Sequence, residues 1–345
     1  MAPAASLLAR PATARRAARA DAGGMYSTQE TNRDLHVVIG AGGQLGRALV
    51  SGLVARGLSV RAVARAPVQG LPAGVEQAPG DIGDAREALR LCRGAAVVYG
   101  CFGAPHVEWA RSFSRMTCGA LAGASAAAAK LVFADNLYAY GPQTGTLVES
   151  LPATTYGAKP RLRAELAAML LHAHATGRVR VAIARASDFY GPGVISAMLG
   201  APVIRSVAAG RRVFLPGDLD APHTFTFTPD FAAALIELAL ADDADGQVWH
   251  APSAPALSLR DILGRVAALA GSRLRLAGIP GAGLRVAAWL SPSIRELVEL
   301  GFQWDRPYRV SHAKYAARFA HQPTPIDDGL RATVAWALGA AVTAP

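Results

Sequence analysis

Residues 35–46 read LHVVIGAGGQLG, an apolar run typical of a β-strand followed by three glycines in a GxxGxxG pattern. Leucines then recur at helical spacing through the segment 47–56, and Gly57 ends that predicted helix. A second apolar run, residues 58–63, has the composition of another strand. A strand, a glycine turn, a helix and a strand in about 30 residues have the length of one βαβ unit, which predicts two parallel strands.

The three glycines of this turn each match a physical requirement of dinucleotide binding. Gly40 permits the sharp turn from strand to helix, Gly43 lets the backbone approach a pyrophosphate, and Gly46 lets the helix pack closely against the sheet. The helix start, at Gln44 and Leu45, offers backbone N–H groups and the positive end of the helix dipole to phosphate. We therefore expect these five residues to bind a dinucleotide cofactor.

The end of the second strand distinguishes between the two nicotinamide cofactors. Sites for NAD usually place Asp or Glu there, where the carboxylate binds the ribose 2′-hydroxyl. This strand has no acid and ends at Arg65, whose forked donors match a 2′-phosphate. We therefore expect NADP, with NAD as the alternative cofactor. The other interpretation of Arg65 is a solvated surface arginine.

Strand-like apolar runs continue to alternate with helical segments as far as residue 183. This alternation predicts an α/β fold, a Rossmann-type doubly wound parallel sheet covered on both faces. After Ser187 the pattern becomes irregular, and helical stretches at 258–270, 283–300 and 326–338 indicate a smaller, mixed lobe. We expect the Rossmann domain to cover residues 34–190, completed by about 223–250, and a C-terminal substrate-binding lobe to cover 191–222 and 251–345.

Composition limits the classes of function. The chain has 35 Lys+Arg against 25 Asp+Glu, a formal charge of +10, but only three of the basic residues are lysine and none forms a charge block. We therefore expect no nucleic-acid partner. No apolar stretch is long enough to span a bilayer, so we expect no membrane partner. Three cysteines without a CxxC motif predict a reducing, cytoplasmic location and no metal site.

Residues 1–33 are expected to form a disordered N-terminal extension outside the fold. They are rich in Ala and Arg, contain no acid before Asp21 and show no apolar periodicity. An organellar transit peptide has a similar composition, and Met25 is a second candidate start, so both alternatives stay open.

Several later segments, taken in order, resemble the extended (atypical) short-chain dehydrogenase/reductase superfamily, in its NAD(P)-dependent epimerase/dehydratase family. They follow the glycine turn at residues 80–82 (GDI), 99–103 (YGCFG), 135–141 (DNLYAYG) and 185–193 (RASDFYGPG). The resemblance covers about residues 35–340. It implies hydride transfer on a small carbonyl, hydroxyl or sugar-like substrate, with epimerisation through a transient ketone as a variant of the same chemistry. It also implies a set of cofactor contacts, with Asp188 supporting the backbone near the nicotinamide: Asp81, Ile82, Cys101, Gly103 and Asp188.

The chain departs from this family at the residues that carry its chemistry. The family uses a Tyr-x-x-x-Lys pair on one helix face, with a Ser or Thr from the fifth strand. Here Lys159 follows Tyr156 at +3, and Pro160 favours a loop conformation for both. Asn136 stands at the Ser/Thr position, where it can orient a carbonyl but cannot relay a proton. Another register places Gly157 and Arg161 at the Tyr and Lys positions, and neither register is intact.

Two classes of function therefore remain open. In an enzyme, Tyr156 is the best proton donor, with Lys159 lowering its pKa and Asn136 orienting the substrate, and Tyr138 and Tyr140 are reserve candidates. The alternative is a catalytically silent NADP(H)-binding sensor or regulatory protein. The complete C-terminal lobe favours the enzyme, while the altered motif favours the sensor.

Two further expectations concern surfaces. His223 either lines the substrate cleft or is an ordinary surface histidine. The resemblance implies a homodimer through the sheet-covering helices, where small residues between 120 and 129 allow close helix approach. Ordinary packing of those residues against the sheet is the alternative.

Overall fold

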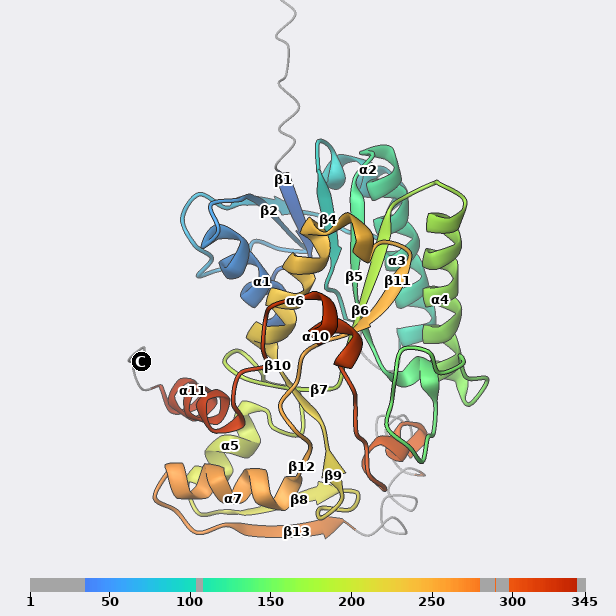
Figure 1. The fold of residues 1–345 in the computed structure, drawn as a ribbon. Coiled ribbons are helices and arrows are strands. Elements are labelled where there is room, and N and C mark those ends of the chain that lie inside the picture. The colour runs from blue at the N-terminus through green and yellow to red at the C-terminus, as the bar shows by residue number, and fades with distance from the viewer. Residues whose placement is uncertain (1–34, 104–107, 280–288, 290–297, 340–345) are drawn as a thin grey trace, which may run out of the picture. The chain divides into compact units, whose positions relative to one another are not determined.

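The computed structural model shows a seven-stranded parallel sheet with helices on both faces (Figure 1), which confirms the expected Rossmann fold. The structure describes residues 35–103, 108–279, 289 and 298–339. The strand order is β11-β6-β5-β4-β1-β2-β3, and every neighbouring pair is parallel. The strands are β1 (Leu35–Ile39), β2 (Ser59–Ala64), β3 (Glu76–Pro79), β4 (Val97–Gly100), β5 (Lys130–Asn136), β6 (Val181–Ala186) and β11 (Gln247–His250).

The central strands are buried on both faces, which explains their nearly continuous apolar sequences. In β1, Val38 joins the hydrophobic cluster on one face, while Val37 and Ile39 join the cluster on the other. The first cluster is covered by α1 (Gln44–Val54) and α6 (Thr228–Leu240), and the second by α2 (Ala85–Cys92), α3 (Trp109–Ala126) and α4 (Ala158–Ala175).

The Ala-rich segment that begins at Trp109 predicts a helix as far as Lys130, but α3 ends at Ala126, four residues earlier, and Lys130 explains why. Ala128 adopts a left-handed conformation (φ 54°), and Lys130 begins β5 with its side chain 1% exposed. Its ammonium donates to the carbonyls of Leu238 (2.6 Å) and Ala241 (2.7 Å) and pairs with Asp245 at 2.5 Å. This buried cation therefore satisfies the carbonyls at the end of α6 and joins that helix to the sheet.

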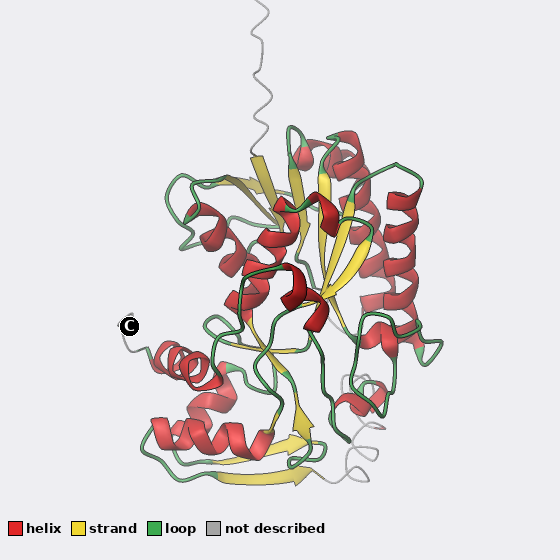
Figure 2. Cartoon of the chain, in the orientation of Figure 1, coloured by secondary structure: helices red, strands yellow, loops and turns green. Residues whose placement is uncertain are grey.

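A group of helices and strands lies beyond the sheet (Figure 2) and encloses a third hydrophobic cluster. It is built by α5 (Ala201–Ala208), α7 (Leu259–Leu269) and α11 (Ile326–Leu338), with the parallel pair β8 (Arg212–Pro216) and β13 (Arg275–Ile279). Two short pairs, β7 (Asp188–Tyr190) with β10 (Phe225–Phe227) and β9 (Pro222–His223) with β12 (Leu257–Ser258), lie between this cluster and the sheet.

The short helix α10 (Ala313–Arg318) belongs to the sequence range expected in the lobe, yet it packs on the sheet. Phe319 packs on Trp249 of β11, Tyr315 packs on Phe319, and all three belong to the cluster under α6. The described residues all belong to one compact unit. The division into two domains therefore stays a prediction. Residues 1–33 and most of the helix expected at 283–300 lie outside the described residues.

Candidate active site

The glycine turn lies at the point where the chain changes direction across the sheet. β1 pairs with β2 on one side and with β4 on the other, and such a switch point leaves a crevice at the carboxyl ends of the strands. Gly40 has φ +86°, and a Cβ there would lie 2.6 Å from the Cys101 carbonyl oxygen. A Cβ on Gly46 would lie 2.2 Å from the Gly40 carbonyl oxygen. Both positions therefore require glycine.

The start of α1 fits a phosphate. Gly43 is the N-cap, no side chain caps the helix, and its first turn carries no acid. The first N–H groups of α1, at Gln44 and Leu45, therefore remain open to a ligand. Around the crevice, Asp81 and Ile82 follow β3, and Cys101 and Gly103 follow β4. The residues present fit a dinucleotide.

Two arginines near the turn, Arg47 and Arg65, differ in their hydrogen bonds. Arg47 donates to the carbonyls of Gly42 (3.3 Å) and Gln69 (2.7 Å). Arg65 is exposed just beyond β2 and donates no hydrogen bond to the part of the chain that the structure describes. Its guanidinium is therefore available to a ligand. Asp81, by contrast, already accepts from the Gly83 N–H and from Arg115, each at 2.9 Å.

A cavity of about 510 Å³ opens at the carboxyl ends of β5 and β6. Gln44, the first residue of α1, and Gly103 form part of its wall, so the phosphate-binding turn and the cavity share one boundary. Aromatic side chains of Trp109, Tyr138 and Trp304 form another part. The polar lining includes Asn136, Ser187, Asp188 and Gln303.

Asn136 and Ser187 place neighbouring polar groups in this wall. Asn136 Oδ1 accepts the Tyr138 N–H at 3.0 Å, which leaves its amide nitrogen without a described partner. The Ser187 hydroxyl is buried and also has no hydrogen-bond partner among the described residues. Because buried polar atoms in folded proteins are nearly always hydrogen-bonded, the orphaned hydroxyl indicates a missing ligand or water.

Asp188 is held at one of its two carboxylate oxygens. Oδ2 accepts from the Trp304 indole at 2.7 Å and lies 3.2 Å from His223 Nε2, a contact of ion-pair range rather than an aligned hydrogen bond. Burial disfavours the carboxylate, but His223 and Trp304 outweigh this effect and lower the pKa of Asp188 below its ordinary value. Oδ1 accepts no hydrogen bond from the described chain, and the side chain is 18% exposed.

Tyr156 and Lys159 lie outside this cavity. Tyr156 is 43% exposed, and its hydroxyl donates to the Glu299 carbonyl at 3.4 Å. Lys159 was expected in a loop, but it lies in the first turn of α4, where Glu299 accepts its N–H at 2.9 Å and that of Ala158. Capping by this carboxylate outweighs the effect of Pro160, whose missing N–H costs nothing in a first turn. Burial lowers the pKa of Lys159, although Glu299 opposes this shift.

The sequence and the fold both resemble those of known proteins. A family model described as the NAD dependent epimerase/dehydratase family matches residues 36–250. The chain belongs to this family. The match confirms the resemblance expected from the sequence. A search of curated protein sequences gives no significant match.

Several solved structures with a similar fold contain bound NAD. One is dTDP-glucose 4,6-dehydratase from Bacillus anthracis in complex with NAD (17% identity, 88% of this chain and 96% of that chain, TM-score 0.72). Another is DesIV, a dTDP-glucose 4,6-dehydratase from Streptomyces venezuelae, with NAD and TYD bound (18%, 88% and 97%, TM-score 0.72). MoeE5 in complex with UDP-glucose and NAD is a third (19%, 89% and 99%, TM-score 0.71). At these identities the likeness concerns the fold.

Sequence reasoning missed a buried charge network behind the cavity of this epimerase/dehydratase family member. Asp135 pairs with Arg163 of α4 and, at 3.0 Å, with Arg185 of β6, and all three side chains are at most 7% exposed. Burial opposes ionisation of Asp135, but the two guanidinium groups lower the pKa of this carboxyl. The network fixes the ends of β5 and β6 next to Asn136 and Ser187. The sequence did contain a signal for this network, because Asp135, Arg163 and Arg185 are charged residues at otherwise apolar strand and helix positions.

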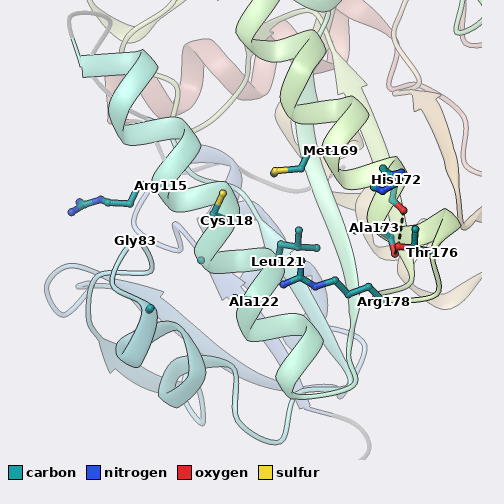
Figure 3. Close-up of a pocket in the computed structure, with 12 residues that line it drawn as sticks. Gly83, Arg115, Cys118, Leu121, Ala122, Met169, His172, Ala173, Thr176 and Arg178 are labelled. Atoms are coloured by element: carbon teal, nitrogen blue, oxygen red, sulfur yellow. Dashed lines mark hydrogen bonds between the residues drawn. The ribbon is translucent and has the colours of Figure 1, made fainter.

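A second cavity, of about 550 Å³, lies between α3 and α4 (Figure 3). Arg115, Cys118, His172 and Arg178 line it. The small residues expected to serve a dimer are used inside the chain, since Ala120 and Ala124 are fully buried and a Cβ on Gly123 would lie 2.6 Å from Cys92 Sγ of α2. Packing within the chain therefore accounts for that face.

Proposed function

We propose that this protein is an NADP(H)-dependent oxidoreductase or epimerase that acts on a small carbonyl, hydroxyl or sugar-like substrate in the cavity beside the glycine turn. The observation that carries the proposal is the shared boundary: Gln44 begins the helix that would hold the pyrophosphate and also lines the cavity. The glycine turn would hold the pyrophosphate of the cofactor beside this cavity, and the bound nicotinamide would supply or accept a hydride there.

The chain's own residues would bind and orient the substrate oxygen. Asn136 and Ser187 end neighbouring strands, because Asn136 pairs with Ala186 in the β5–β6 register. The free amide nitrogen and the orphaned hydroxyl are both hydrogen-bond donors, and two donors at one oxygen stabilise the negative charge that develops during reduction. The aromatic wall excludes water from the reacting atoms.

The finer assignments are parts of the same proposal. Arg65 supports NADP, whereas the similar structures named above were solved with NAD. Complexes of those proteins with UDP-glucose or TYD support a sugar-like substrate. Cofactor contacts would come from the glycine turn, Arg65 and the residues that follow β3 and β4.

The catalytic assignment made from the sequence receives unequal support. Asn136 lines the cavity, which supports its role in orienting a carbonyl. Tyr156 and Lys159 stay proposals for proton transfer, although neither of them lines the cavity and both contact Glu299. The position of these two residues outside the cavity favours the second candidate function, a catalytically silent NADP(H) sensor or regulator.

Location and assembly complete the proposal. Cys92, Cys101 and Cys118 are all free thiols, which supports a reducing, cytoplasmic location. Among the described helices, none combines the length and apolarity needed to cross a membrane. A homodimer through the helices that cover the sheet stays part of the proposal on the family resemblance alone, because the small residues of α3 pack within the chain.

Two measurements on the full chain test this function. Titration of NADPH and NADH fluorescence measures cofactor binding, and absorbance at the nicotinamide band measures turnover with sugars, polyols, aldehydes and ketones. We expect micromolar cofactor affinity and turnover of at least one carbonyl or alcohol substrate, which Asn136→Ala lowers without loss of cofactor binding. Cofactor binding without any turnover would favour the sensor, and no cofactor binding would refute both functions.

A further inference from the structure

We propose that Asp188 is the general base of the cavity and that His223 is the positioning residue that holds its carboxylate ionised. This inference rests on the proposed redox function. It assigns to Asp188 the proton transfer that the sequence had assigned to Tyr156, which lies outside the cavity. It gives Asp188 a role beyond the backbone support expected from the family resemblance.

The contacts of His223 determine which of its ring nitrogens carries a proton. His223 Nδ1 lies 3.1 Å from the Gln303 carbonyl oxygen, and because a carbonyl only accepts, Nδ1 carries a proton. A neutral His223 would then present an unprotonated Nε2 to the Asp188 carboxylate, whose Oδ2 is 3.2 Å away, and two electron-rich atoms at that distance repel each other. One further proton must therefore lie on this pair. The Trp304 indole N–H donates to the same oxygen, Oδ2, which therefore acts as an acceptor, and this places the further proton on His223 and leaves Asp188 a carboxylate.

The two carboxylate oxygens of Asp188 differ in their contacts. His223 and Trp304 both contact Oδ2, so the carboxylate is anchored on one side. Oδ1 has no described donor, and Asp188 lines the cavity together with Asn136 and Ser187. A substrate hydroxyl held by those two residues would therefore meet an oxygen that is ionised, oriented and open.

Packing holds the pair in this arrangement. β7 and β10 pair in the register Phe225↔Asp188, which ties the strand of Asp188 to the segment that follows His223. The Tyr308 ring stacks on the imidazole (5.2 Å, 21°), and the Tyr308 N–H donates to the Pro222 carbonyl at 2.9 Å. His223 is 4% exposed, so its position is set by the protein rather than by solvent.

The tyrosines around the pair are poorly suited to the same task. Among the described residues, Tyr138 and Tyr308 also interact electrostatically with Asp188, and burial raises the pKa of both phenols above their ordinary value. Burial also raises the pKa of Tyr140, whose hydroxyl donates to His250 at 2.7 Å. A phenol accepts a proton only after it has ionised, and a raised pKa keeps these phenols protonated near neutral pH, whereas the Asp188 carboxylate is ionised and can accept a proton.

The proposed step is the oxidation of a substrate alcohol by oxidised nicotinamide dinucleotide. The O–H bond breaks and its proton passes to Asp188 Oδ1. The C–H bond breaks and the hydride leaves for the dinucleotide, while the electron pair of the O–H bond forms the C=O bond. His223 stays protonated throughout, and its charge keeps Asp188 ionised before the step.

Nuclear magnetic resonance tests the ion pair without any substrate. In the full chain labelled with ¹⁵N-histidine and ¹³C-aspartate, we expect both ring nitrogens of His223 to be protonated and the Asp188 carboxyl to be ionised at pH 7. In Asp188→Asn, which keeps the shape and an acceptor oxygen, Nε2 should lose its proton. A singly protonated His223 beside an ionised Asp188 in the wild-type spectrum would refute the pair, whether or not turnover is found.

Kinetics test the base. Asp188→Asn should lower kcat for alcohol oxidation about 10²- to 10⁴-fold, with NADP affinity unchanged. His223→Gln should move the acid limb of the kcat profile to higher pH, because loss of the neighbouring positive charge makes the carboxyl easier to protonate. The exposed Asp220→Asn and His172→Gln are matched controls and should behave like wild type. Turnover by the wild type that Asp188→Asn retains would overturn this inference and leave the proposed function standing, whereas absent cofactor binding would overturn the function.

Discussion

Gly46 packs against Gly40 so closely that a Cβ on Gly46 would lie 2.2 Å from the Gly40 carbonyl oxygen and 2.7 Å from Cα of Ala41. Both contacts are with backbone, so Gly46→Ala can be accommodated only by moving α1 away from the turn. We expect this change to destabilise the protein by about 1–3 kcal/mol and to abolish NADPH binding. Chemical unfolding and NADPH fluorescence measure the two effects.

Gly264→Ala provides the matched control. Gly264 lies inside α7, and a Cβ there would meet nothing within 4 Å. Alanine is the better helix former, so this variant should gain about 0.5–1 kcal/mol. Equal stability losses in the two variants would mean that close approach at the turn does not explain the effect.

Arg65→Ala should change cofactor preference. The exposed guanidinium beyond β2 has no described partner, and loss of charge-assisted hydrogen bonds to a 2′-phosphate should weaken NADP binding about 10- to 100-fold while leaving NAD binding unchanged. Dissociation constants for both cofactors, measured by calorimetry, give the ratio. Arg86→Ala, an exposed arginine on α2, should leave that ratio unchanged. An unaltered NADP/NAD ratio in Arg65→Ala would eliminate the role of this arginine.

Tyr156→Phe tests the proton donor expected from the sequence. The Tyr156 hydroxyl contacts the Glu299 carbonyl and the ring packs on Phe302 at 5.6 Å, outside the cavity. We expect kcat to change less than about threefold, since general acid–base groups typically contribute 10²-fold or more. Tyr138→Phe, within the cavity, is the companion variant. A hundredfold loss in Tyr156→Phe alone would restore the assignment made from the sequence.

Stability should fall between pH 6.5 and 4 because of His250. The Tyr140 hydroxyl donates to its Nε2 and its Nδ1 lies 2.9 Å from the Ser311 carbonyl oxygen, while burial lowers its pKa from 6.5 to about 4. Between pH 6.5 and 4, His250 binds a proton in the unfolded chain but stays neutral in the folded chain. The stabilisation is therefore complete above pH 6.5 and is lost as pH falls towards 4, by up to about 3 kcal/mol.

Urea unfolding at several pH values measures this loss. His250→Gln should be less stable at pH 7 but should show a flatter dependence between pH 6.5 and 4. The exposed His172→Gln should keep the wild-type slope. An identical slope in wild type and His250→Gln would contradict the assignment to His250.

The fold was predictable because each local signal agreed with the global arrangement. The apolar run before Gly40, the glycine spacing and the alternation of strands with helices all require a parallel sheet, and the structure has one. The ends of elements were less predictable. Lys130 looked like the last residue of a helix, but its place in β5 depends on carbonyls at positions 238 and 241, which no local pattern encodes.

The cavity was only partly predictable for the same reason. Asn136 could be found from the strand that precedes it, since its position follows from β5 alone. The surroundings of Asp188 could not, because Trp304 and His223 reach it from distant parts of the sequence. The glutamate that caps α4, Glu299, is equally remote from Lys159 along the chain. Sequence spacing predicts residues that share an element, and these contacts join different ones.

The separation between Asp188 and Trp304 has a consequence for synthesis. These residues are 116 positions apart, and the cap of α4 by Glu299 spans 141 positions. At a translation rate of about 5–20 residues per second, a nascent chain carries Asp188 for on the order of 10 s before Trp304 is made. The strands of the sheet, which end at His250, are all synthesised before that point. All strands of the sheet are therefore synthesised before the site can be completed. The Asp188 carboxylate reaches its working position only after the chain has extended past Trp304.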